Sequence, residues 1–141
     1  SASFVGVRAN HTKAHFDRAL LEGVALSMLD CKKTLESVGI EHIDTATIIG
    51  GGASSSLWRQ IVADALGIRL ARRRESDSSH GGAMLAGVSA GMFAGFTAAL
   101  NACNSVESYT EPSAENTARY ERLYTKYKAI HDALAPIYHG L

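Results

Sequence analysis

Three consecutive glycines, Gly50 to Gly52, interrupt the middle of this 141-residue chain and constrain its fold more than any other feature. The apolar run before them, "TATII", is typical of a buried strand, and "SSSLWRQIVADAL" after them is typical of a helix that ends at Gly67. Because glycine has no Cβ atom, main-chain atoms at such a turn can approach another group closely. The pattern leaves two interpretations open, a tight strand-to-helix turn and a binding site for a ligand.

The place of the glycines favours a ligand if the strand belongs to a parallel sheet. The carboxyl ends of parallel strands are where α/β proteins bind ligands, and the start of the next helix offers free N–H groups and a positive dipole end. Ser54, Ser55 and Ser56 add hydroxyl groups that could cap the helix or bind a ribose or phosphate. A glycine-rich turn is common, so the motif alone decides nothing.

The remaining segments alternate between strand and helix patterns. We expect short strands at residues 3–8, within "HIDTATIIGG" and within "IRLAR", and helices at about 10–39, 55–66, 80–92 and 114–134, with a loop over 97–112. This order predicts an α/β layer in which helices pack on a sheet. Three strands make a narrow sheet, so further strands of the same domain are expected elsewhere.

Apolar residues repeat at helical intervals in the two long helices, and both stripes are expected to be buried. The first stripe comprises Phe16, Leu20, Val24, Met28, Cys31 and Leu35. The second comprises Tyr120, Leu123, Tyr124, Tyr127 and Ile130, in a helix that Pro136 is expected to end. In the central strand, Ala46, Ile48 and Ile49 are apolar enough to be covered on both sides, as in a parallel sheet.

Charge and composition argue for a small-molecule ligand. The 14 basic residues balance the 14 acidic ones, and the longest basic run is Arg72 to Arg74, so neither a nucleic-acid partner nor a membrane surface is predicted. Cys31 and Cys103 lie far apart, and the first residues lack a secretory pattern, which together favour a cytoplasmic location. The most apolar window, residues 81–100, is interrupted by glycines and predicts buried helix rather than a membrane span.

Other chemistry receives little support from the residues. His11 and His15 have metal-ligand spacing, but no third ligand accompanies them, so capping or solvated roles are expected and no metal site is predicted. The serines lack the Gly-x-Ser-x-Gly pattern of a nucleophile. One alternative stays open: "GGGASS" followed by Arg72 to Arg74 also fits a noncatalytic NADP-binding module.

Four segments, in chain order, resemble the C-terminal part of the FGGY carbohydrate kinases, closest to the xylulokinase branch. They are "FVGVRANHTKAHFDRALLEGVA", "IIGGGASSSLWRQIVADALG", "DSSHGGAMLAGVSAGMF" and "YERLYTKYKAIHDALAPIY". The resemblance implies an actin-like, ribonuclease H-like ATPase fold. Residues 1–141 would form a C-terminal nucleotide-binding portion, and the N-terminal domain, with its sugar pocket and catalytic aspartate, would be absent.

The resemblance also implies a reaction and a site. Members transfer the γ-phosphoryl group of ATP, with Mg²⁺, to a sugar or polyol hydroxyl. Gly51, Gly52 and Ala53 would lie against the adenosine and α-phosphate of ATP or ADP, and Ser55 or Ser56 would lie near the ribose or the adenine edge. Trp58 is expected to pack beneath the loop rather than stack on the base.

A third interpretation is a structural or assembly fragment. In isolation, the apolar faces of the two long helices would be partly exposed, which would favour a homodimer. This interpretation is compatible with a kinase origin, under which the chain alone is expected to be inactive.

Overall fold

The computed structural model describes residues 2–40, 42–73, 78–103 and 105–138, which divide into two compact units. A sheet unit comprises Ile43–Ala63 and Ile68–Glu111, and a helical unit comprises Ser1–His42, Asp64–Gly67 and Pro112–Leu141. The last turn of helix α2 (Ser56–Leu66) belongs to the helical unit, and the rest of that helix belongs to the sheet unit.

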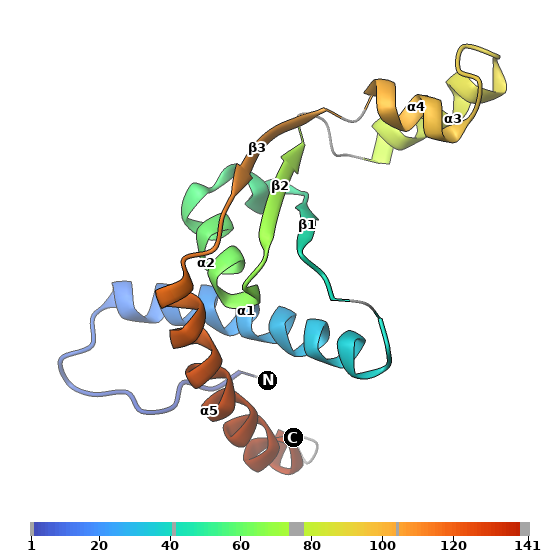
Figure 1. The fold of residues 1–141 in the computed structure, drawn as a ribbon. Helices are drawn as coiled ribbons and strands as arrows, with labels where there is room; N and C mark the ends of the chain where they lie inside the picture. Colours follow the sequence, from blue (N-terminus) through green and yellow to red (C-terminus); the bar gives the residue numbers. More distant parts are fainter. Residues whose placement is uncertain (1, 41, 74–77, 104, 139–141) are drawn as a thin grey trace. The chain divides into compact units, whose positions relative to one another are not determined.

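The sheet unit contains a mixed three-stranded sheet in the order β1, β2, β3 (Figure 1). β1 (Thr45–Ile48) pairs parallel with β2 (Arg69–Arg73), and Ala46 lies opposite Leu70 in the register. β2 pairs antiparallel with β3 (Val106–Thr110), with an irregularity between Arg72 and Arg73. The parallel β1–β2 pair places the residues after β1 at a carboxyl edge of the sheet, as the sequence predicts.

A short 3₁₀ helix, η1 (Gly51–Ser54), and the helix α2 (Ser56–Leu66) connect β1 to β2. Ile61 and Val62 of α2 are buried together with Leu70 of β2. Gly67 follows α2 with φ of +64°, the left-handed conformation that glycine adopts readily after a helix. The strand–turn–helix–strand unit predicted from the glycines is confirmed.

Two helices follow β2 in the sheet unit, α3 (Ser78–Ser89) and α4 (Phe96–Cys103), and they contact each other. The turn between them packs Phe93 against Gly87, where an added Cβ would lie 2.8 Å from the phenyl ring. The small residue at this position therefore permits a close approach, as expected for this glycine- and alanine-rich segment.

The helical unit contains α1 (Lys13–Ser37) and α5 (Ala114–Tyr138). The buried Asp64 accepts hydrogen bonds from the backbone N–H of Ser113 (2.7 Å) and from the side-chain amide of Asn116 (2.9 Å). An acidic side chain at this end of α5 satisfies an N–H group that has no partner within the helix and complements the helix dipole.

Several predicted elements are wrong. Residues 2–8 form no strand, because a strand needs a hydrogen-bonding neighbour and the described sheet consists of β1, β2 and β3 alone. The predicted loop over 97–112 instead contains most of α4 and all of β3, whose pairing with β2 no local pattern reveals. Helix α5 continues through Pro136 to Tyr138, since proline removes one hydrogen bond but takes a helical φ.

The predicted apolar stripe of α1 is also wrong in its burial. Leu20 and Val24 are 54% and 53% exposed, and Met28, Cys31 and Leu35 are exposed as well. The buried residues of α1 are Ala25, Leu26 and Leu29, on the neighbouring face. In β1, Ile48 is buried as expected, but the adjacent Ile49 is 61% exposed.

Among the described helices, none combines the length and the hydropathy that crossing a bilayer requires.

Candidate functional site

The candidate site is the glycine loop, residues 50–55, which leaves the carboxyl end of β1. Gly50 has φ of +82°, which turns the chain out of the strand in a conformation that other residues rarely adopt. Ala53 N–H donates to the Gly50 carbonyl (3.0 Å), and Ser55 N–H donates to the Gly52 carbonyl (3.1 Å). These bonds close the loop on itself and fix its shape before any ligand binds.

Two neighbouring glycines in this loop have different surroundings. A Cβ built on Gly51 would meet no atom within 4 Å, so the main chain there faces open space. A Cβ built on Gly52 would lie 2.9 Å from Cδ1 and 3.0 Å from Nε1 of Trp58. Gly51 therefore offers a bare main-chain surface, whereas Gly52 is required for the packing of the indole. The interpretation of Trp58 as a packing residue is supported by this contact.

The alanine and the serines of the predicted site occupy the start of α2. The side chain of Ala53 is buried beneath the loop, so only its main chain is available to a ligand. The Ser55 hydroxyl accepts a hydrogen bond from the N–H of Trp58 (3.2 Å) and therefore caps the helix. Ser54 and Ser56 are exposed. The two interpretations of the serines, capping and ligand binding, are compatible at this loop.

Arg59 of α2 contacts the loop, and the sequence assigned this residue no role. Its Nη1 donates to the carbonyl of Ala53 (2.6 Å), which fixes a half-buried guanidinium against the loop. Its Nε is buried and has no hydrogen-bond partner among the residues that the structure describes. Ala53 and Arg59 are six residues apart, which is not the spacing of three or four that brings residues together on a helix. The sequence alone therefore does not reveal this contact.

Other predicted candidates have local partners. Arg72 forms an ion pair with Glu107 of β3 at 3.4 Å, so its charge is balanced within the sheet, and Arg74 lies outside the described residues. His11 Nδ1 accepts from the N–H of Arg8, and His15 Nδ1 accepts from the N–H of Thr12. His15 therefore caps the start of α1, while the exposed His11 bonds the turn before that helix.

Comparison with known proteins identifies the family. Residues 1–90 match the model of the FGGY family of carbohydrate kinases, C-terminal domain. The chain belongs to this family. It is 38% identical over 130 residues to a xylulose kinase of Staphylococcus epidermidis, an alignment that covers 92% of the chain and 26% of the relative. It is 36% identical over 117 residues to a glycerol kinase of Citrifermentans bemidjiense, covering 82% of the chain and 23% of the relative.

Solved structures support the same assignment. The crystal structure of xylulose kinase from Rhodospirillum rubrum has a TM-score of 0.81 and 29% identity, covering 97% of this chain and 28% of that one. The predicted fold class, an α/β part of an actin-like, ribonuclease H-like ATPase fold, is confirmed. This FGGY chain spans about a quarter of the length of the curated relatives that it matches. The NADP-binding alternative is not favoured by these matches.

Proposed function

We propose that this FGGY chain is the C-terminal, adenine-nucleotide-binding portion of a carbohydrate kinase. The whole protein would transfer the γ-phosphoryl group of ATP to a sugar or polyol hydroxyl. A sugar pocket and a catalytic aspartate would belong to an N-terminal domain outside these 141 residues.

The observation that carries this proposal is the open main chain at Gly51. The glycine is exposed, has no neighbouring atom within 4 Å of where a Cβ would lie, and comes three residues after the end of the parallel strand β1. A flat purine nucleoside can approach such a surface without meeting a side chain. Helix α2 begins five residues later at Ser56, and its first N–H groups favour a phosphate.

The range of matched relatives supports a nucleotide role rather than a sugar role. The chain aligns with relatives named xylulose kinase, glycerol kinase and L-fuculokinase. These names specify different phosphate acceptors, whereas ATP as phosphate donor is common to the family. A segment shared by all three is therefore better suited to bind the donor.

The five proposed binding residues have distinct roles in this account. The main chain of Gly51, Gly52 and Ala53 would lie against the adenosine and the α-phosphate. Ser56 would be available to the ribose or the adenine edge, while Ser55 would act there only alongside its capping bond.

Mg²⁺ accompanies ATP in this proposal but is not assigned to residues of this chain. Among the described residues, no group of three or more histidine, cysteine, aspartate or glutamate side chains is arranged to hold a metal ion. Phosphoryl transfer also needs a base and groups that hold the phosphates.

Self-association stays a prediction. The exposed stripe on α1, which includes Leu20 and Val24, supports it, because exposed apolar surface favours association with another surface. A homodimer and a nucleotide-binding role are compatible.

Isothermal titration calorimetry tests the nucleotide site. Wild-type chain should bind MgATP and MgADP without requiring a 2′-phosphate. Gly51→Val should weaken nucleotide binding by at least ~tenfold, which corresponds to ~1.4 kcal/mol, because the new side chain would fill the space for adenosine. Gly23→Val is the matched control, since Gly23 lies on α1 and its Cβ would also meet no atom within 4 Å.

Three results would contradict the proposal. These are unchanged nucleotide affinity in Gly51→Val, equal losses in Gly51→Val and Gly23→Val, and preferential binding of NADPH by the wild-type chain.

A further inference from the structure

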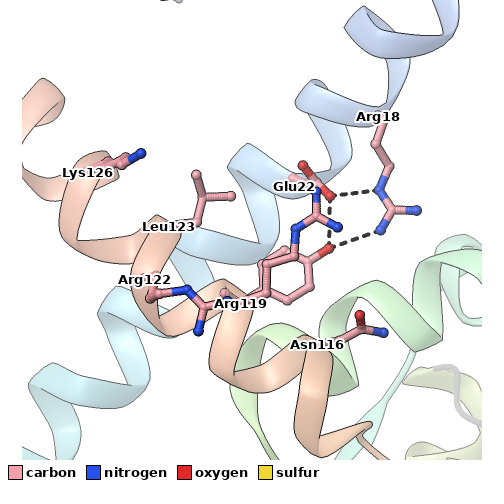
Figure 2. A pocket seen from close by; sticks show the side chains of 8 residues that line it. Arg18, Glu22, Asn116, Arg119, Arg122, Leu123 and Lys126 are labelled. Atoms are coloured by element: carbon pink, nitrogen blue, oxygen red, sulfur yellow. Dashed lines mark hydrogen bonds and ion pairs between the residues drawn. The ribbon is translucent and has the colours of Figure 1, made fainter.

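A concave surface lies within the helical unit, where α1 and α5 form a cleft of about 440 Å³ (Figure 2). Arg18 and Glu22 of α1 line it, and α5 contributes Arg119, Arg122 and Lys126. Its volume lies within the roughly 300–1,000 Å³ of typical small-molecule sites. The glycine loop belongs to the sheet unit, so the cleft is a separate feature of the molecule.

Only one of the four cationic side chains in the cleft is balanced by an acid. Arg18 Nε pairs with the Glu22 carboxylate at 2.8 Å, and Arg18 Nη2 donates to the Tyr120 hydroxyl at 3.1 Å. Tyr120 in turn donates to Glu22 at 3.0 Å, so Glu22 is already engaged twice. Figure 2 shows these three bonds on one side of the cleft, and the two that involve Tyr120 join α1 to α5.

The other three cations, Arg119, Arg122 and Lys126, have no such partner. Within the described part of the chain, none of their side chains forms a hydrogen bond or an ion pair. They follow one another at intervals of three and four residues on one face of α5, where adjacent like charges repel. Four cations and one carboxylate leave this cleft with a net charge of about +3 when all are ionised.

Elsewhere on the same two helices, basic residues are paired. Lys33 of α1 lies 3.1 Å from Glu121, and Lys128 of α5 lies 3.4 Å from Asp30. Where α1 and α5 meet near Lys33 and Lys128, opposite charges therefore pair. In the cleft, by contrast, the positive charges of α5 are not compensated. A solvated basic face needs no concave surface, whereas an anion site does.

We propose that this cleft binds a small, multiply charged, phosphate-bearing anion held by Arg119, Arg122 and Lys126. A guanidinium presents parallel N–H donors that match two oxygens of a phosphate, and an ammonium adds a point charge. A single carboxylate would neutralise only one of the three unpaired cations. Asn116, at the edge of the cleft, donates to Asp64 and retains a carbonyl oxygen there.

Pyrophosphate is the probe for this site, and the 141-residue chain at low, constant ionic strength is the sample. Titration followed by amide chemical shifts should show saturable binding, with the largest shifts near residues 119, 122 and 126 of α5 and residue 18 of α1. This measurement uses the wild-type chain, so it does not depend on any variant folding. The absence of saturable binding, or shifts confined to other residues, would overturn the proposal.

A charge-matched pair of double variants separates a specific site from general attraction. Arg119→Gln/Arg122→Gln and Lys33→Gln/Lys128→Gln each remove two positive charges from the same pair of helices. The cleft variant should lose pyrophosphate affinity at least ~tenfold, and the control should lose less than ~threefold, since long-range attraction between exposed charges is weak and screened. Equal losses would overturn the proposal.

Two further arms define the ligand and the site. Citrate carries comparable charge on carboxylates, and binding of citrate as tight as that of pyrophosphate would contradict the phosphate class. Gly51→Val should leave pyrophosphate affinity unchanged, because the glycine loop takes no part in this cleft. Loss of pyrophosphate binding in Gly51→Val would assign the anion to the loop instead. Failure of nucleotide binding at the loop would leave the cleft proposal intact.

Discussion

Gly52 and Trp58 show how one missing side chain can serve a structure and a site together. The indole occupies the space that a Cβ of residue 52 would need, and this contact supports the loop from below. Gly51, one residue earlier, has no such neighbour. Two glycines that are equivalent in the sequence are therefore constrained by different physical requirements.

The Gly52–Trp58 contact predicts opposite effects for two alanine substitutions. Gly52→Ala should lower the free energy of unfolding by about 1–3 kcal/mol, because the indole must shift to admit the methyl group. Gly51→Ala should leave this free energy unchanged or raise it by up to about 1 kcal/mol, because alanine restricts the unfolded chain. Chemical denaturation followed by circular dichroism measures both. Equal effects of the two substitutions would show that the indole does not confine residue 52.

The hydroxyl of Tyr124 donates to the carboxylate of Asp30 at 2.5 Å and joins α5 to α1. This hydrogen bond lowers the pKa of Asp30 below its usual value and, with some burial, raises the pKa of Tyr124 to about 12. The Asp30 contribution to stability is present above about pH 4 and is lost as pH falls below it. The Tyr124 contribution is present below about pH 10 and is lost as pH rises through about 12.

Tyr124→Phe should therefore destabilise the chain only within a pH window. At neutral pH the loss should be less than about 1 kcal/mol, because both residues are only partly buried and solvent screens their hydrogen bond. The difference from wild type should shrink above about pH 10 and below about pH 4. Urea unfolding across this range measures it. Tyr127→Phe is the control, since the Tyr127 hydroxyl makes no hydrogen bond within the described residues, and a matching pH profile in that variant would contradict the assignment.

Helix α5 depends on a residue from another helix for its start. Asp64 lies in the last turn of α2, yet its carboxylate accepts from the backbone of Ser113 and the side chain of Asn116. The segment match with the FGGY kinases includes Asp64, and the structure gives it this structural role. Its burial makes the contribution larger than that of an exposed cap.

Asp64→Ala should lower the free energy of unfolding by about 2–4 kcal/mol, because two donors lose a charged acceptor in a buried place. Asp132→Ala, also an aspartate-to-alanine change but at a residue whose side chain is 68% exposed, should change it by less than about 0.5 kcal/mol. Thermal unfolding compares the two. A small effect of Asp64→Ala would mean that water replaces the carboxylate at the start of α5.

The exposed stripe of α1 explains why helical periodicity identified the helix but not its buried face. Apolar residues lie on two neighbouring faces of α1, and the buried face carries Leu26 and Leu29. The sequence favoured the longer stripe that includes Leu20 and Val24, which is exposed. Periodicity reports which residues share a face, whereas burial depends on which elements lie against that face. Strand β3 was not predicted for a related reason: it is held in the sheet by its pairing with β2, and the local sequence does not show that pairing.

For the chain as a whole, length limits the activity to be expected. The chain spans 26% of the xylulose kinase of Staphylococcus epidermidis, so the greater part of that enzyme has no counterpart in these 141 residues. Phosphoryl transfer requires nucleotide, metal, phosphate contacts and a base in one place. The 141-residue chain should therefore be able to bind a nucleotide without catalysing phosphoryl transfer.

We expect the 141-residue chain alone to bind MgATP without phosphorylating a sugar. A coupled assay of ADP formation with D-xylulose or glycerol measures activity, and calorimetry on the same sample measures binding. The full-length xylulose kinase of Staphylococcus epidermidis serves as the positive control. Sugar-dependent ADP formation by the chain alone would refute this expectation.

The amino-acid sequence alone determined the local order of this protein: the β1–glycine loop–α2–β2 unit, the two long helices and the family. These features follow from nearest neighbours along the chain, since glycine conformations, capping and periodicity act over a few residues. Only the tertiary structure decided that Trp58 confines Gly52, that Asp64 caps α5, and that Arg18 and Arg119 line one cleft. The residues that make these contacts are not spaced at the repeat of a helix or a strand, so no sequence pattern predicts the contacts. They form only when the elements pack together.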